Sequence, residues 1–234
     1  MRAVGSKRWT ILLIVVAAQT LSLAGVASAL GTSFFDGFGY FDTARWSKGD
    51  HTLGRSYLDP ANVSVSGGNL RIALPARAFE GGEILTNELH GYGSYSARMK
   101  LPNAPGSITG FFLYKAPDYE REIDIEVYND ATRRIMFNTY AGGRQTHTRT
   151  VRLPFDPTTG FHEYRFDFLK GASTGATSVA FYVDGQKMKA WNTGIPRTSM
   201  HLMLNTWFPT WLDGRRPKKT AYTYVDSISY TAQP

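Results

Sequence analysis

The chain of 234 residues contains no cysteine. If it is exported, packing must stabilise it, with or without a metal ion, because disulfides cannot contribute. The sequence also has no His-x-x-x-His or cysteine-based metal motif, no phosphate-binding loop and no Gly-x-Ser-x-Gly elbow. These absences exclude several classes of metalloenzyme, nucleotide-binding protein and serine hydrolase.

The sequence shows no convincing amphipathic helix. The numbers of positive and negative residues are both modest. Lysine and arginine number 26 and aspartate and glutamate 19, and residues 1–29 hold three of the basic residues and no acidic one, which leaves 23 − 19 = +4 for the rest. This charge says little about partners. Because no nucleic-acid-binding motif accompanies it, we expect no nucleic-acid partner.

The N-terminal segment has the pattern of a secretory signal. Basic residues precede an apolar stretch over residues 11–26, and Ala27-Ser28-Ala29 gives the small-x-small cleavage pattern. The alternative is an uncleaved membrane anchor, but polar residues interrupt the stretch, which is short for a span. We predict a signal peptide over residues 1–29 and a secreted, extracellular protein without stable membrane association. We expect a single domain over residues 30–234 and a monomer.

Short extended segments separated by turn residues follow from Phe34 onward. About a dozen strands at regular spacing predict an all-β fold, an antiparallel β-sandwich or jelly roll. Asp184-Gly185 lies between two such segments and predicts a two-residue hairpin. The predicted strands include residues 63–65, 70–74, 95–100, 108–114, 122–128, 134–140, 146–153, 162–169, 178–183, 186–191, 201–207 and 222–230.

The run Glu122-Ile123-Asp124-Ile125-Glu126 alternates carboxylates with isoleucines. Alternation of this kind is the period of a β-strand, so the isoleucines and Val127 would face the core and the carboxylates the opposite face. Like charges in a row on one sheet face repel one another and cost stability. A row of this kind therefore indicates a function.

Glycoside hydrolysis fits this row, because it needs two carboxyl groups beside the scissile bond, one of them protonated. The Cα atoms of Glu122 and Glu126 would lie roughly 13 Å apart on an extended strand, and long side chains on a concave sheet could close most of the gap to the about 5–5.5 Å of a retaining enzyme. Asp124 between them could separate the two pKa values. The alternatives are an ordinary polar strand face and an adventitious cation site.

Further residues are candidates for sugar binding, since aromatic rings stack on sugars and amides bind hydroxyls. Asn138 lies one strand after the carboxylates, and Asn205 and Trp207 alternate on a later strand, with Trp211 in the next loop. Glu83 is expected near the cleft wall. The basic cluster over residues 215–219 is a solvated loop or the rim of a site for an acidic polysaccharide.

The acidic run resembles the active-site signature of glycoside hydrolase family 16, and other segments match landmarks of its bacterial lichenases in order. These segments are Tyr92–Lys100, Phe111–Tyr114, Phe161–Tyr164, Tyr182–Gly185 and Met203–Trp207. The resemblance spans Phe34 to Tyr230. It implies a jelly-roll sandwich of the concanavalin A-like type, whose concave cleft binds a polysaccharide, and retaining, endo-acting hydrolysis of a β-1,3-1,4- or β-1,3-glucan.

By position in the motif, Glu122 would be the nucleophile, Glu126 the general acid/base and Asp124 the assisting carboxylate. The resemblance also implies that Glu83, Asn138, Asn205 and Trp207 line subsites. No cofactor is required for this chemistry. A structural calcium site would map to the Asp226 side chain and the carbonyls of Gly37 and Gly68, although one carboxylate is weak support.

The sequence departs from the lichenase pattern at several positions. Glu120-Arg121 replaces a tryptophan before the signature, Leu85 a basic subsite residue, and Met136 a glutamine. The resemblance therefore leaves the linkage open. Two other functions also stay open: a transglycosylase on the same scaffold and a non-catalytic glycan-binding module.

Overall fold

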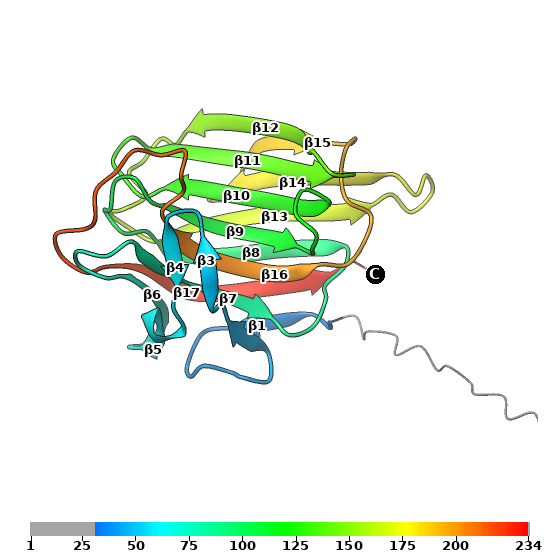
Figure 1. The fold of residues 1–234 in the computed structure, drawn as a ribbon. Helices are drawn as coiled ribbons and strands as arrows, with labels where there is room; N and C mark the ends of the chain where they lie inside the picture. Colours follow the sequence, from blue (N-terminus) through cyan, green and yellow to red (C-terminus); the bar gives the residue numbers. More distant parts are fainter. Residues whose placement is uncertain (1–30, 234) are drawn as a thin grey trace, which may run out of the picture.

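The alternating acidic run forms the central strand β10 (Arg121–Tyr128) of a curved sheet (Figure 1). The computed structural model describes residues 31–233, so the predicted signal segment 1–29 lies outside the described residues. Within residues 31–233, no helix is long and apolar enough to span a bilayer.

We call the sheet that contains β10 the cleft sheet. Its strands follow the order β12-β11-β10-β9-β16-β7-β4-β3, and β2 also pairs with β7. Neighbouring strands are antiparallel, except that β4 runs parallel to β7. Their bounds are β2 Trp46–Lys48, β3 His51–Leu53, β4 Ser56–Leu58, β7 Glu80–Thr86, β9 Ile108–Tyr114, β11 Arg134–Ala141, β12 Gln145–Arg152 and β16 His201–Trp207.

The second sheet, which we call the outer sheet, has the order β15-β14-β13-β8-β17-β6-β5, with β1 on β17. A single turn of 3-10 helix, η1 (Pro60–Asn62), precedes β5. The bounds are β1 Phe34–Asp36, β5 Val63–Ser66, β6 Asn69–Leu74, β8 Gly93–Lys100, β13 His162–Lys170, β14 Thr177–Val183, β15 Gln186–Trp191 and β17 Ala221–Ala232. The predicted all-β antiparallel sandwich is confirmed.

The core between the sheets is rich in aromatic side chains. Phe111 and Phe137 of the cleft sheet meet Phe166 and Phe181 of the outer sheet, with ring centroids 5.3 Å apart for Phe111–Phe166 and 4.8 Å for Phe137–Phe181. All four side chains are fully buried. Burying large aromatic surfaces is the main stabilising contribution available to a chain without disulfides.

Two local features show how well the sequence pattern indicates structure. The Asp184-Gly185 hairpin between β14 and β15 is confirmed, and both residues have the positive φ that this turn needs. Strand β7, in contrast, was not predicted, because Gly81-Gly82 directly follow its first residue. A Cβ on Gly81 would lie 2.0 Å from the Thr206 carbonyl oxygen, so the close approach of β16 requires glycine there.

Candidate active site

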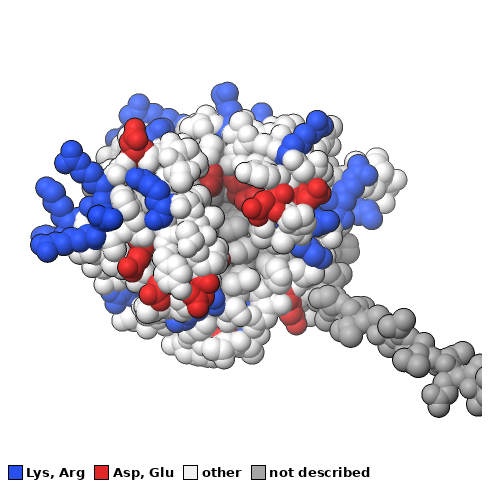
Figure 2. Space-filling model, in the orientation of Figure 1, with Lys and Arg blue, Asp and Glu red and all other residues white. Residues whose placement is uncertain are grey.

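Strand β10 separates its side chains as the alternation predicts. The two isoleucines and Val127 are fully buried in the core, whereas Glu122, Asp124 and Glu126 line a cleft of about 670 Å³ on the other face of the sheet. In Figure 2 acidic side chains gather in the hollow at the centre of this face. Asp124 is the most enclosed of the three, with 3% of its surface exposed.

Antiparallel register sets the neighbours of each carboxylate. Asp124 pairs with Asn138 on β11, and Glu126 pairs with Gly110 on β9, which in turn pairs with Asn205 on β16. A Cβ at position 110 would lie 2.7 Å from the Asn205 Oδ1 atom. Glycine therefore allows the Asn205 amide to lie in the floor of the cleft beside Glu126.

Asn138 holds two of the carboxylates together. Its Nδ2 atom donates to Asp124 Oδ1 at 2.7 Å and to Glu126 Oε2 at 3.1 Å, and its own Oδ1 accepts from Gln145 Nε2 at 3.4 Å. The side chain is fully buried beneath the carboxylates. These contacts are those of a group that orients carboxylates, whereas the sequence led us to expect a subsite contact.

Burial raises the pKa of all three carboxyl groups. The pKa of Glu122 rises to about 8, through burial first and then the charges of Glu126 and Asp118. Burial raises the pKa of Glu126 to about 7, against the hydrogen bond from Asn138, which lowers it. The pKa of Asp124 is also raised by burial and by its two neighbours. Near neutral pH the cluster therefore holds protons, as an acid catalyst requires.

Glu83 lies on the opposite side of the cleft floor. Its Oε1 atom lies 3.0 Å from His51 Nε2, and its Oε2 accepts from Asn205 Nδ2 at 3.1 Å. The Oδ1 atom of Asn205, in contrast, is buried without a hydrogen-bond partner among the described residues. This oxygen is an acceptor that a sugar hydroxyl can satisfy.

Aromatic rings form the walls of the cleft. Trp207 and Trp211 both line it, and Trp211, which is 49% exposed, meets Tyr128 edge to face at a centroid distance of 5.9 Å. On the other side, Tyr119 and Tyr140 lie 5.7 Å apart. Among the described residues that line the cleft there is no lysine or arginine. An acidic, aromatic cleft suits a neutral sugar chain.

Several cleft residues were not predicted from the sequence. They come from distant segments or loops: His51, Tyr114, Asp118, Tyr119 and Gln145. Tyr140 lines the cleft as its alternation with Asn138 on β11 predicts, since Phe137 between them points to the core. His51 carried no signal, because β3 reaches the cleft only through its pairing with β4 at the sheet edge. Met136, which departs from the lichenase pattern, also lines the cleft.

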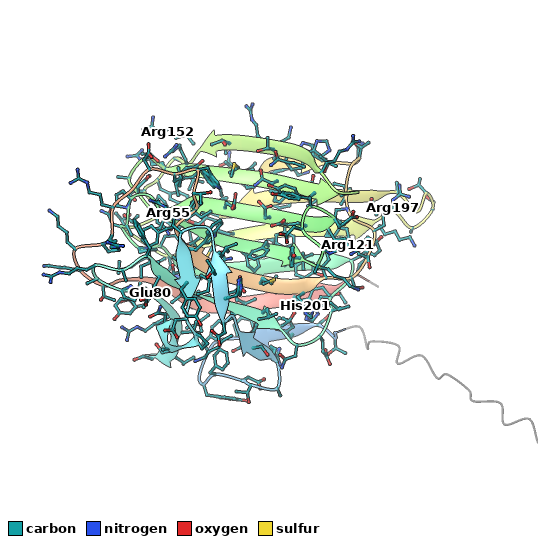
Figure 3. The ribbon with its side chains drawn as sticks, viewed as in Figure 1. Arg55, Glu80, Arg121, Arg152, Arg197 and His201 are labelled. Atoms are coloured by element: carbon teal, nitrogen blue, oxygen red, sulfur yellow. The ribbon has the colours of Figure 1, made fainter. Side chains whose placement is uncertain are left out.

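Arg55 fixes the loop that carries Trp211. Its guanidinium donates to the carbonyl oxygens of Pro209 at 3.1 Å, Leu212 at 2.7 Å and Gly214 at 3.2 Å. Figure 3 labels Arg55 next to this loop, between β16 and β17. A fork of charged donors holding three carbonyls orders the loop and thereby positions the tryptophan at the cleft wall.

The three segments named for calcium converge at the bulge of β17. β1 and β6 pair with the same edge of β17, with Asp36 opposite Ile228 and Leu70 opposite Val225, so the register brings Gly37 and Gly68 to the stretch of β17 around Asp226. The Asp226 carboxylate lies 3.1 Å from Arg98. The described residues contain no cluster of three or more acidic, histidine or cysteine ligands. Calcium at this place stays a prediction, with one carboxylate and backbone carbonyls as its donors.

Comparison with known proteins agrees with this geometry. The family model for glycosyl hydrolases family 16 matches residues 55–224. A β-glucanase of Bacillus subtilis (strain 168) is 32% identical over 240 residues, which cover 94% of this chain and 97% of that protein. A second, from Bacillus amyloliquefaciens, is 31% identical over 239 residues and covers 94% and 98%.

Solved structures give the same result. The β-glucanase of Bacillus licheniformis superposes with a TM-score of 0.77 at 30% identity, over 87% of this chain and 99% of that one. A prokaryotic β-1,3-1,4-glucanase (lichenase) from a mouse hindgut metagenome superposes with a TM-score of 0.76 at 27% identity, over 87% and 100%. The chain belongs to family 16 of the glycosyl hydrolases.

Proposed function

We propose that the protein is an endo-acting, retaining hydrolase of a β-glucan. The observation that carries this proposal is the row of three carboxyl groups on β10 in the floor of an open cleft, where Asn138 holds two of them together. The sequence relatives carry the name β-glucanase, which supports the substrate class. The absence of lysine and arginine among the described residues of the cleft wall supports a neutral glucan over an acidic one.

The reaction proceeds by two displacements at the anomeric carbon. In the first, a Glu122 carboxylate oxygen bonds to this carbon while the glycosidic C–O bond breaks, and Glu126 gives its proton to the leaving oxygen. In the second, Glu126 takes a proton from water, and the water oxygen replaces Glu122. Asp124, which accepts a hydrogen bond from Asn138, lies between Glu122 and Glu126 on β10. Its carboxyl group shifts the pKa values of both neighbours.

Position in the motif assigns these roles, since the pKa order alone would place the proton on Glu122. Chemical rescue separates the roles. With azide and an activated β-glycoside, Glu122→Ala should yield the inverted α-azide, because azide attacks where the nucleophile is missing. Glu126→Ala should yield the retained β-azide from the intact glycosyl-enzyme. The opposite pairing would exchange the two assignments.

We propose β-1,3-1,4-glucan as the first substrate to test and β-1,3-glucan as the second. The measurement is reducing-end release from barley β-glucan, laminarin and xyloglucan by residues 30–234, with Glu122→Gln as the paired control. Release from barley glucan that the variant lacks is the expected result. Binding without release by the unchanged protein would favour a glycan-binding module, and longer products with an added acceptor would indicate a transglycosylase.

We further propose that the protein is secreted after cleavage behind Ala29 and acts as a monomer with no required cofactor. N-terminal sequencing of the exported protein should begin at Leu30. Retention of the full N-terminus on a membrane fraction would favour the anchor instead.

A further inference from the structure

A second groove lies at the end of the sandwich, apart from the cleft. Its walls are the segment after β8 (residues 101–105), the loop over residues 214–221, and Tyr222 and Tyr224 on β17, and its volume is about 840 Å³. It shares no lining residue with the cleft among the described residues. The β16–β17 loop nevertheless connects the two, because Trp211 lines the cleft and Gly214 begins the groove.

The groove is basic. Five of its lining residues carry a positive charge, and none of the lining residues in the described chain is acidic; the basic residues are Lys100, Arg215, Arg216, Lys218 and Lys219. Figure 2 shows lysine and arginine side chains gathered at the left end of the molecule, where the orange-red β16–β17 loop turns in Figure 1. Uncompensated positive charge in a concavity attracts an anionic ligand.

Aromatic side chains stand among these charges. Tyr222 and Tyr224 alternate on the outer face of β17, and their ring centroids lie 5.8 Å apart. Arg71 lies 4.3 Å from the Tyr222 ring centroid, and the Lys100 ammonium lies 5.5 Å from that of Tyr224. Both tyrosines stay partly exposed. Rings beside cations offer a sugar both a stacking surface and a partner for a charged substituent.

The backbone that carries the lysines is anchored at both ends. Arg55 holds the Gly214 carbonyl, the Arg77 amide donates to the Pro217 carbonyl at 2.7 Å, and the Ala76 amide donates to Thr220 Oγ1 at 3.2 Å. A backbone that is already ordered before binding lowers the entropy cost that binding of a ligand must offset.

We propose that this groove is a non-catalytic binding site for an anionic polysaccharide whose sugar units carry carboxylates. Such a polymer is disfavoured in the cleft, where acidic side chains gather, and favoured here, where the lining is basic and aromatic. The site would hold the enzyme on an acidic polysaccharide while its cleft remains free for a neutral glucan. This inference does not depend on the activity proposed for the cleft.

The test measures binding of residues 30–234 to immobilised polygalacturonate. The wild-type protein should bind at low salt and bind more weakly at physiological salt, because exposed charges are screened. Lys218→Gln/Lys219→Gln should weaken binding by about tenfold, as expected for two surface ion pairs at low salt. The matched control is Lys187→Gln/Lys189→Gln, which removes the same net charge from β15 at the far edge of the outer sheet.

Thermal melting should show that each variant is folded, and Lys100→Gln on β8 replaces the loop variant if it is not. Two results would overturn the proposal. One is no binding of the wild-type protein at low salt. The other is equal weakening by the loop variant and its β15 control, which would show that overall charge and not the groove attracts the polymer.

Discussion

Glu122→Gln should make the folded protein more stable at alkaline pH. Burial and the neighbouring carboxylates raise the pKa of Glu122 from 4.5 to about 8. Between these two values the folded protein holds a proton that the unfolded chain has released, so the stability of the wild-type protein falls as the pH rises through this window. A neutral glutamine removes that cost.

The size of the effect follows from the shift. At about 1.4 kcal/mol per pKa unit, a shift of roughly 3.5 units corresponds to at most about 5 kcal/mol. Because Glu126 contributes part of the repulsion and itself takes up protons, we expect a gain of about 2–4 kcal/mol at pH 9. Below pH 4.5, where Glu122 is protonated in both states, the two proteins should be equally stable.

Urea unfolding at pH 4, pH 7 and pH 9 measures this difference, with Glu88→Gln on the exposed surface as the matched control. The control should show no pH-dependent difference from the wild-type protein. Two results would refute the idea that burial and repulsion of the carboxylates in the cleft destabilise the folded protein. One is equal stability of Glu122→Gln and the wild-type protein at pH 9, and the other is a loss of stability of Glu122→Gln at every pH.

Three further predictions concern residues around the cleft. Asn138→Ala should reduce kcat about 10–100-fold, because the hydrogen bonds to two carboxylates are lost. It should also move the basic limb of the pH–rate profile to higher pH, because Asn138 lowers the pKa of Glu126; an unchanged limb would contradict this. Arg55→Lys should raise KM more than it lowers kcat, since the single nitrogen of lysine cannot reach carbonyls that Arg55 contacts through three separate nitrogens; unchanged KM would show that the Arg55 clamp is not needed. Calcium should raise the melting temperature of the wild-type protein and not of Asp226→Ala, and equal shifts would exclude the predicted site.

Sequence reasoning succeeded where chemistry lies on one strand. The alternation over residues 122–126 predicted which side chains of β10 face the core and which line the cleft, because a period of two permits only that arrangement. The Asp184-Gly185 hairpin was also predicted from local sequence, because two residues determine the conformation of this turn.

Sequence reasoning failed where distant segments meet. Strand β7 was missed because Gly81-Gly82 reads as a turn, whereas these glycines allow close packing against β16. The contact of Glu83 with His51, 32 residues away in sequence, depends on the short edge strands of the cleft sheet. Arg55 donates to carbonyls more than 150 residues away in sequence, and no local sequence pattern predicts such a contact.

The most direct test of the central claim is to trap the covalent intermediate. An activated 2-fluoro β-glucan oligosaccharide should label the protein once, because the fluorine slows both displacements while the good leaving group keeps the first one fast enough for the glycosyl-enzyme to accumulate. Peptide mapping by mass spectrometry should place the glycosyl group on Glu122. Label on Glu126, or full turnover of the β-glucan with no covalent label under the same conditions, would contradict the mechanism proposed here.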